Sequence, residues 1–296
     1  ATAQTAFVEP LEIIELNNQL TELQFNITEE KHQILCELTA YFQPISNEIQ
    51  ESFNILKYID LHFTMAKLAH QIKAIRPEIN KGGEIKLEKA INPLFTLADK
   101  NAVTLNLKLN NKKILLLSGP NAGGKTVVLK SLGLYALMAQ CGLFISAKNA
   151  QLPIYTRFMA DIGDRQSIED DLSTFSAHIQ NLAEIVEKAD ENTLILLDEL
   201  GTGTDPDAGA ALSRAILETL LKKNSTVVAT THLGSLKVWA SEEKGIVNGG
   251  MIFDSDALAP TYELQLGTPG ASYALEISKR MGLSDDIIKR SKELVG

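Results

Sequence analysis

The sequence predicts an α/β fold with a mixed, mostly parallel sheet, preceded by an all-helical arm. Residues 1–80 contain no glycine and carry apolar residues at helical spacing, whereas residues 81–296 alternate short apolar runs with helical patterns. Short apolar runs bounded by turn residues are typical of buried strands, and strands that alternate with helices favour a parallel sheet. The third observation is a glycine-rich loop between one such strand and the following helix, which indicates a binding site in the second part.

The arm carries most of the excess negative charge. Residues 1–80 hold 5 basic and 11 acidic residues, against 28 and 37 in all 296 residues. Thr28, followed by two glutamates, is typical of a helix start. Pro44 is expected to kink or split the helical run and Pro77 to end it, which predicts two or three long helices. The acidic excess is either a surface for a basic partner or, as the sequence favours, a solvated helix face.

The composition excludes several classes of protein. With 45% hydrophobic and 22% charged residues, the chain is globular and not disordered. It has neither an uncharged apolar stretch of about 18 residues nor a basic start followed by an apolar run, so we expect no membrane span and no signal peptide. Cys36 and Cys141 lie far apart, which fits a reducing cytoplasm. The net charge of −9 argues against a surface that binds nucleic acid everywhere, but leaves a local basic patch open.

Lys81, Gly82 and Gly83 mark the expected boundary between the arm, residues 1–80, and the second domain, residues 81–296. The sequence predicts strands over residues 113–118, 193–198, 225–230, 246–253 and 261–266, and helices over 125–141, 174–190, 207–223, 272–281 and 284–295.

The segment from Gly119 to Thr126 reads GPNAGGKT and satisfies the eight-position phosphate-loop pattern. It lies between an expected strand and an expected helix, which is the context that this pattern requires. Glycines let backbone N–H groups turn toward phosphates, and the helix start adds positive partial charge. Lys125 can reach the outer phosphates, and the Thr126 hydroxyl can bind Mg²⁺. This context disfavours the alternative, a glycine turn without a ligand.

Two acidic residues end the next buried strand. Asp198 would lie next to the Mg²⁺ of the phosphate loop, and Glu199 is placed to accept a proton from an attacking water. Without the phosphate loop, such a pair would more often be a solvated strand end. His232 follows another buried strand, where a polar side chain can sense the γ-phosphate or orient the water. The other histidines lack such companions and are interpreted as packing or surface residues: His32, His62, His70 and His178.

Two further segments are candidates for the site. Ser173 is a natural N-cap, and a helix start with hydroxyls is an anion site, although the alternative is a cap alone. The glycine-rich turn from Gly201 to Asp207 is either a connector or a loop that carries the state of the site to a partner subunit.

Taken together and in order, these motifs resemble the ATPase core of the MutS family. They also look like its second bacterial branch, which lacks the mismatch-reading domain and is linked to recombination control or to the rescue of collided ribosomes. The strings that carry the resemblance are GPNAGGKT, DIGDRQSIEDDLSTFSAHI, LILLDELGTGTDPDAGAAL, TTHL and GTPGASYA, with FVEP at residues 7–10 and LNN at residues 16–18.

The resemblance implies an ABC-type P-loop ATPase domain that binds ATP or ADP with Mg²⁺ and forms a head-to-tail homodimer. The arm would be part of the core and lever, and residues 271–296 would serve dimerisation. The helix start at Ser173–Ser176 would face the γ-phosphate held by the partner's Lys125, and Gln166 would couple the site to the arm. The implied roles are catalysis for Glu199 and His232, metal binding for Thr126 and Asp198, and nucleotide contact for Gly119, Pro120, Asn121, Ala122, Gly123, Gly124, Lys125, Thr126, Val127, Gln166, Ser173, Thr174 and Ser176.

The resemblance further implies an ATP hydrolase whose dimer moves a helical clamp on branched DNA, in recombination and repair, or on stalled ribosomes. One alternative is a nucleotide-gated binding module with little turnover. Another is a transporter-type ATPase subunit, which would need an LSGGQ-like helix start, whereas residues 172–176 read LSTFS. Ile91–Leu94 departs from the Arg-His-Pro-Leu pattern usual before this phosphate loop. We expect a fragment without the small C-terminal nuclease domain of the branch, and no membrane partner.

Overall fold

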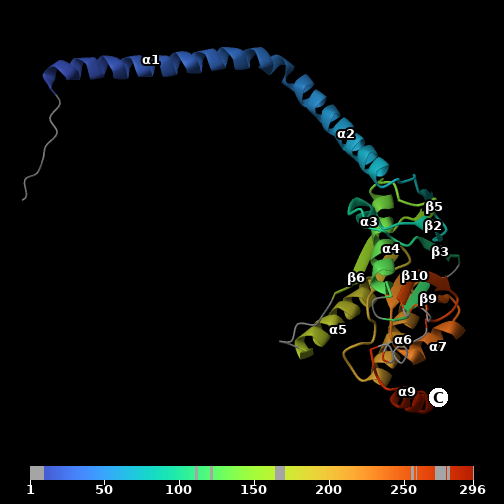
Figure 1. The fold of residues 1–296 in the computed structure, drawn as a ribbon. Coiled ribbons are helices and arrows are strands. Elements are labelled where there is room, and N and C mark those ends of the chain that lie inside the picture. Colours follow the sequence, from blue (N-terminus) through green and yellow to red (C-terminus); the bar gives the residue numbers. More distant parts are fainter. Residues whose placement is uncertain are drawn as a thin grey trace, which may run out of the picture. The chain divides into compact units, whose positions relative to one another are not determined.

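The computed structural model describes residues 10–110, 113–120, 123–163, 171–254, 257, 259–270, 278 and 281–295. The chain forms two compact units, Ala1–Thr64 and Met65–Gly296. The first unit is helical and the second is built on two sheets (Figure 1). The division falls inside a helix, and the domain boundary expected at residue 80 stays a prediction.

The first unit consists of α1 (Leu11–Phe42), a short 3₁₀ turn η1 (Gln43–Ile45) and most of α2 (Ser46–Gln71). Pro44 lies in η1, so the predicted split of the helical run is confirmed. The expected helix start at Thr28 is wrong, because α1 runs through it. There the Thr28 hydroxyl donates to the carbonyl of Gln24, a bond that threonine makes inside helices.

Helix α2 ends at Gln71, before the expected stop at Pro77. Lys73 adopts a left-handed φ of 51°, and Ile75 exchanges backbone hydrogen bonds with Ile145. The left-handed residue stops the helix, and the bridge between Ile75 and Ile145 lies within the second unit.

A six-stranded sheet forms the centre of the second unit. In the order β10-β9-β4-β8-β7-β6, all neighbours are parallel except β10 and β9, which confirms the predicted mixed, mostly parallel sheet. Strands β4, β7 and β8 are buried at every residue, as expected where both faces are covered. The strands are β4 (Ile114–Ser118), β6 (Arg157–Asp161), β7 (Thr193–Leu197), β8 (Thr226–Thr230), β9 (Ile246–Asp254) and β10 (Ala259–Leu266).

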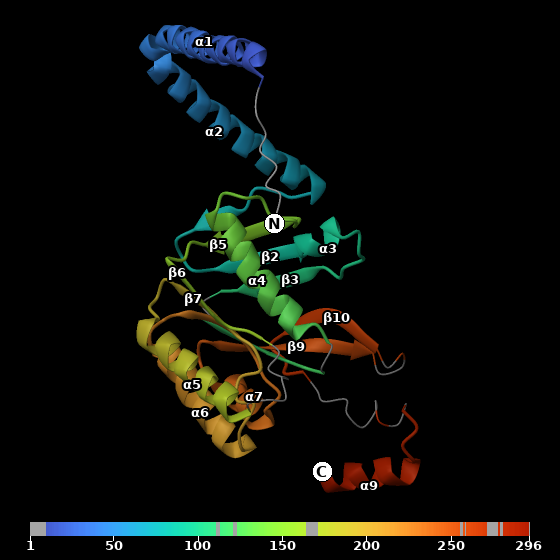
Figure 2. The same cartoon turned by 90° about the vertical axis from the view of Figure 1, so that its left-hand side faces the viewer.

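Helices cover both faces of this sheet (Figure 2). Leu115 and Leu117 of β4 point to the face that packs against α4, whereas Ile114 and Leu116 point to the face covered by three other helices. This alternation gives the unit two apolar layers, one on each side of the strands. The helices are α4 (Lys125–Gln140) on the first face, and α5 (Asp171–Lys188), α6 (Pro206–Lys222) and α7 (Gly234–Glu242) on the second.

A second, four-stranded sheet, which the sequence analysis did not predict, shares the first apolar layer with α4. The helix expected over residues 272–281 falls almost wholly outside the described residues. Within the described ranges, no helix is long and apolar enough to cross a membrane. The remaining elements are β1 (Glu78–Asn80), β2 (Ile85–Ala90), β3 (Leu105–Leu109), β5 (Asn149–Pro153), α3 (Pro93–Leu97) and α9 (Asp285–Val295).

Candidate functional site

The phosphate-loop segment joins the buried strand β4 to helix α4. Helix α4 begins at Lys125, and its N-cap Gly124 has a left-handed φ of 94°, which glycine adopts without steric cost. The Gly123 N–H donates to the Pro120 carbonyl at 3.1 Å and tightens the turn. The start of α4 therefore faces the loop, an arrangement that suits a bound anion.

Lys125 lies over this loop and is only 6% exposed. Its Nζ donates to the carbonyls of Gly119 and Pro120 at 2.8 and 2.9 Å. Burial lowers the pKa of the Lys125 ammonium, whereas the negative charge of Glu199 opposes that shift. The ammonium is thus held by the two loop carbonyls, with the Glu199 charge near enough to act on it.

Thr230, the last residue of β8, positions both acidic candidates. Its Oγ1 donates to Asp198 Oδ1 at 2.6 Å and accepts from the Glu199 N–H at 2.8 Å. Strand β8 lies between β4 and β7 and is parallel to both, so this hydroxyl fixes the acids that follow β7 at the same end of the sheet as the phosphate loop. Glu199 has a left-handed φ of 53°, and its side chain is 56% exposed at the edge of the sheet.

His232 lies beside Glu199, with 4.0 Å between His232 Nε2 and Glu199 Oε1. Burial lowers the pKa of His232, and the positive charge of Lys125 lowers it further. The neutral imidazole is therefore favoured, and a neutral ring can both donate and accept a hydrogen bond. The structure thus brings together Lys125, Glu199 and His232, three residues that the sequence predicted for one site.

Other predicted site residues are less completely described. Asn121, Ala122 and Gln166 lie outside the described residues. The prediction of Ser173 as the N-cap is wrong, because α5 already includes Asp171 and Leu172. Ser173 and Thr174 lie within the helix, but their side chains lie outside what the structure describes.

The rest of the predicted set can be placed. Thr126 is half-buried and Val127 is 41% exposed on the first turn of α4, while Ser176 is exposed on α5. In the turn after Glu199, the Asp205 carboxylate caps α6 by accepting N–H groups from Asp207 and Ala208, each at 3.1 Å.

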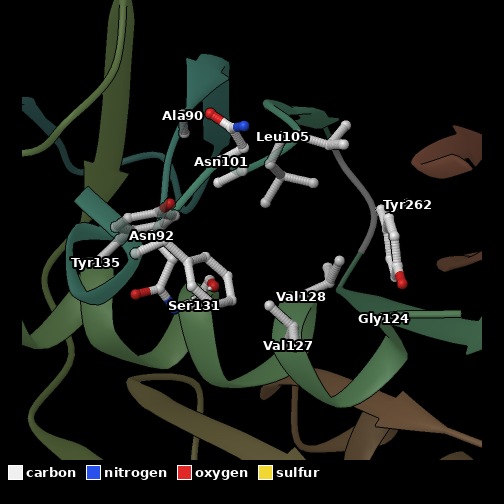
Figure 3. A pocket seen from close by; sticks show the side chains of 13 residues that line it. Ala90, Asn92, Asn101, Leu105, Gly124, Val127, Val128, Ser131, Tyr135 and Tyr262 are labelled. Carbon is white, nitrogen blue, oxygen red and sulfur yellow. Dashed lines mark hydrogen bonds between the residues drawn. The ribbon is translucent and has the colours of Figure 1, made fainter. Parts of the chain in front are cut away.

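A cavity of about 330 Å³ opens beside the start of α4 (Figure 3). Gly124 and Val127 border it on the loop side. In Figure 3, Tyr262 stands on one side of the cavity, with Asn92 and Tyr135 on the other. Tyr262 has a left-handed φ of 60° at an irregularity of β10, which the sequence analysis did not foresee.

The segment that departs from the usual family pattern, Ile91–Leu94, lines this cavity through Asn92. The Asn92 side chain accepts the Leu94 N–H at 3.0 Å to cap α3, and its Nδ2 donates to Ser131 Oγ of α4 at 2.8 Å. The segment therefore attaches the smaller sheet to the phosphate-loop helix. In the sequence this segment stands out only as a departure from the family pattern, and its place in the cavity wall was not predicted.

The site offers a hard divalent cation two oxygen donors. Among the described residues, no group of three or more His, Cys, Asp or Glu side chains could hold a metal ion. The hydroxyl of Thr126 and the carboxylate of Asp198 are oxygen donors of the kind that Mg²⁺ prefers. Mg²⁺ is usually held by one or two carboxylates together with substrate phosphates and water, and this pair fits that pattern.

A buried strand, a glycine-rich loop, a helix start and two acids that follow another parallel strand of the same sheet define a phosphate-loop nucleotide-binding domain. Residues 115–296 match the family described as MutS domain V. The chain belongs to the MutS family, and its second unit contains the MutS-type ATPase domain.

Relatives cover the whole chain and support the narrower branch. Proteins named endonuclease MutS2 are 44% identical over 297 residues in Pediococcus pentosaceus and 43% identical over 297 residues in Finegoldia magna, each covering 100% of this chain. The MutS2 of Thermus thermophilus is 44% identical over 291 residues, or 98% of this chain. The chain spans 38% of the length of each of these relatives, whose names state an endonuclease activity of those whole proteins.

Proposed function

We propose that the second unit binds ATP with Mg²⁺ and hydrolyses it at the carboxyl edge of the six-stranded sheet. One observation supports this proposal above all: the phosphate loop with Lys125 and the two acids lie at the same end of the sheet. Thr230 binds Asp198 and the backbone of Glu199, and His232 lies beside Glu199. A buried ammonium supports phosphate binding, and a carboxylate beside a neutral imidazole supports activation of water.

The cavity beside α4 supports a nucleotide over a simple phosphate. Gly124 borders both the phosphate loop and the cavity, so a triphosphate on the loop would lead directly to a base in the cavity. The Tyr262 ring lies against Gly124, since a Cβ there would come within 3.3 Å of Tyr262 Cδ1. We assign Tyr262 to stacking on the base and Asn92 to the polar rim.

Each residue then has a defined role in hydrolysis. Glu199 accepts a proton from the attacking water, and His232 orients that water or contacts the γ-phosphate. Lys125 and the N–H groups at the start of α4 neutralise the phosphate oxygens. Thr126 and Asp198 would hold Mg²⁺, which supplies further charge neutralisation when bound.

We propose that the site is completed by a second copy of the chain. The start of α5, with Ser173, Thr174 and Ser176, would supply hydroxyls and N–H groups to the partner's γ-phosphate. Exposure of Ser176 supports this role, because a helix start covered by its own chain could not reach a partner. Residues 271–296 would add to the contact, and exposed apolar residues of α9, such as Ile287 and Leu294, support that assignment.

The decisive experiment replaces the proposed base. Glu199→Gln keeps the shape of the side chain but removes its basicity, so hydrolysis should fall by about 10²- to 10⁴-fold while ATP still binds. Glu242→Gln, at an exposed position on α7, is the matched control and should hydrolyse ATP like the wild type. Unchanged hydrolysis in Glu199→Gln would exclude Glu199 as the base. ATP-dependent dimerisation without phosphate release in the wild type would instead favour a nucleotide-gated binding module.

We also propose that the nucleotide cycle acts on branched DNA or on the ribosome, as the family relationship suggests. The acidic composition of residues 1–80 argues against direct contact of this segment with a phosphate backbone. ATP hydrolysis should be measured with four-way-junction DNA and with ribosomes, each over a series of salt concentrations. Stimulation by one target that persists at high salt selects it, since non-specific attraction to phosphates falls steeply with salt.

A further inference from the structure

A buried pair of ionisable side chains joins the end of β6 to helix α5, and it has no part in the chemistry proposed above. Asp161 is 4% exposed and His178 is 7% exposed. His178 Nδ1 lies in contact with Asp161 Oδ2. Burying two polar side chains costs free energy unless they interact with each other or with other polar groups. We therefore looked for what this buried contact holds in place.

Asp161 connects to the proposed metal-binding edge through its backbone. It is the last residue of β6 and lies opposite Leu197 of β7. Its carbonyl accepts the N–H of Asp198 at 2.9 Å. The position of Asp198 therefore depends on that of Asp161.

The side chain of Asp161 connects to helix α5. Besides the contact with His178, its Oδ1 accepts from Asn181 Nδ2 at 3.0 Å. His178 and Asn181 are three residues apart and so lie on the same face of the helix. One carboxylate thus joins two side chains of α5 to the end of β6.

This attachment lies near the start of α5. Among the described side chains of the helix, His178 is the first that is buried. The partly buried Ile179 packs against the core directly after it, and the buried Leu182 and Ile185 follow one and two turns after His178. The pair of His178 and Asp161 is therefore the first buried polar contact along the described part of α5, close to the turns that contain Ser173–Ser176.

We infer that Asp161 and His178 form a latch, and that His178 is a positioning residue for the proposed hydrolysis. The latch fixes the start of α5 relative to Asp198, so that one chain presents its metal-binding edge and its partner-facing helix start in a single geometry. This inference rests on the proposed function, because a latched helix start matters for hydrolysis only where a partner's phosphate reaches it. His178 therefore acts on the nucleotide bound by the other subunit.

The latch is tested first without reference to activity. His178→Leu removes the nitrogen, His178→Asn keeps an N–H close to the position of Nδ1, and Glu184→Ala changes an exposed residue of the same helix. In the full chain, hydrogen exchange of the amides at the start of α5 should rise about tenfold in His178→Leu, and less than about threefold in the other two variants. Equal exchange in His178→Leu and Glu184→Ala would overturn the latch.

Mixed dimers test the action on the partner. In the first mixture, Lys125→Met chains are in excess over His178→Leu chains, so the intact phosphate loop faces an intact α5. In the second, chains carrying both substitutions are in excess over wild-type chains, so the intact loop faces a damaged α5.

The second mixture should hydrolyse ATP about tenfold more slowly per intact loop, with ATP affinity nearly unchanged. A second mixture carrying His178→Asn in place of His178→Leu should recover most of the rate. Equal rates in the two mixtures would overturn action on the partner. A wild-type chain that hydrolyses no ATP would contradict the proposed function instead, and the exchange comparison would still decide the latch.

Discussion

The helical unit and the sheet unit use the same apolar residue types in opposite ways. Every described side chain from Ile13 to Thr64 is exposed, whereas every residue of β4, β7 and β8 is buried. Side-chain contacts described in the helical unit join neighbours one helical turn apart, such as Tyr58 and His62. Those of the site join distant segments, such as Asp198 and Thr230. A helix completes its hydrogen bonds locally, whereas this site exists only once the sheet has formed.

The largest expected effect is on stability, and it distinguishes buried side chains of the sheet unit from exposed side chains of the helical unit. Leu116→Ala removes a fully buried side chain of β4 and should lower the free energy of unfolding of the second unit by about 2–5 kcal/mol. Leu56→Ala changes a residue of α2 that is 61% exposed and should alter it by less than about 0.5 kcal/mol. Urea denaturation, followed by the fluorescence of Trp239 in the sheet unit, measures both. Equal losses for the two variants would break the comparison.

A smaller effect concerns binding. Tyr262→Ala removes the aromatic wall of the cavity, and ATP affinity should fall about tenfold, as expected for the loss of one stacking contact. Tyr58→Ala, an aromatic deletion in the helical unit, is the matched control and should leave ATP affinity unchanged. Titration of each variant with ATP by calorimetry compares them. An affinity in Tyr262→Ala equal to that of wild type would remove Tyr262 from the base site.

The smallest expected effect is electrostatic. Lys125→Met should raise the pKa of His232, because the Lys125 charge contributes to lowering it, whereas Lys57→Met in α2 should leave it unchanged. NMR titration of the His232 ring measures the shift. If the pKa of His232 were the same in Lys125→Met as in the wild type, Lys125 and His232 would not interact electrostatically.

The same pKa has a consequence for stability. With a folded pKa below the unfolded value of about 6.5, the folded chain binds this proton less readily than the unfolded chain. The contribution of neutral His232 to stability is therefore present above that pH, and is lost as the pH falls toward the lowered folded value. His232→Gln should reduce this acid sensitivity, as seen in denaturation at pH 5 and pH 7.

Local patterns predicted much of the sheet unit. The strands that border the phosphate loop and the acids are mostly apolar and buried throughout, and the structure places them within a few residues of the predicted bounds. The smaller sheet was missed because β1 has only three residues and β5 ends in proline, so neither resembles an isolated strand. Its pairing depends on partners far away in the chain.

The candidate site could be predicted only where its chemistry is local. The phosphate-loop pattern identifies Lys125 and Thr126 by spacing alone. No spacing relates Tyr262 to Gly124, because their proximity arises from the irregularity in β10 and the packing of β10 beside β9. His178 was interpreted as a packing or surface residue, and its buried pairing with Asp161 required the structure of β6 and α5.

The strand order also determines when each strand can form its hydrogen bonds during synthesis of the chain. Strand β4 carries the phosphate loop, yet its hydrogen-bonding neighbours are β8 and β9, which leave the ribosome much later. At roughly 10 residues per second, β4 waits on the order of ten seconds with both edges unpaired. The helices of the first unit need no such wait. A newly made chain therefore offers the apolar residues of β4 to chaperones or to aggregation for longer than those of any other strand in the described part of this sheet.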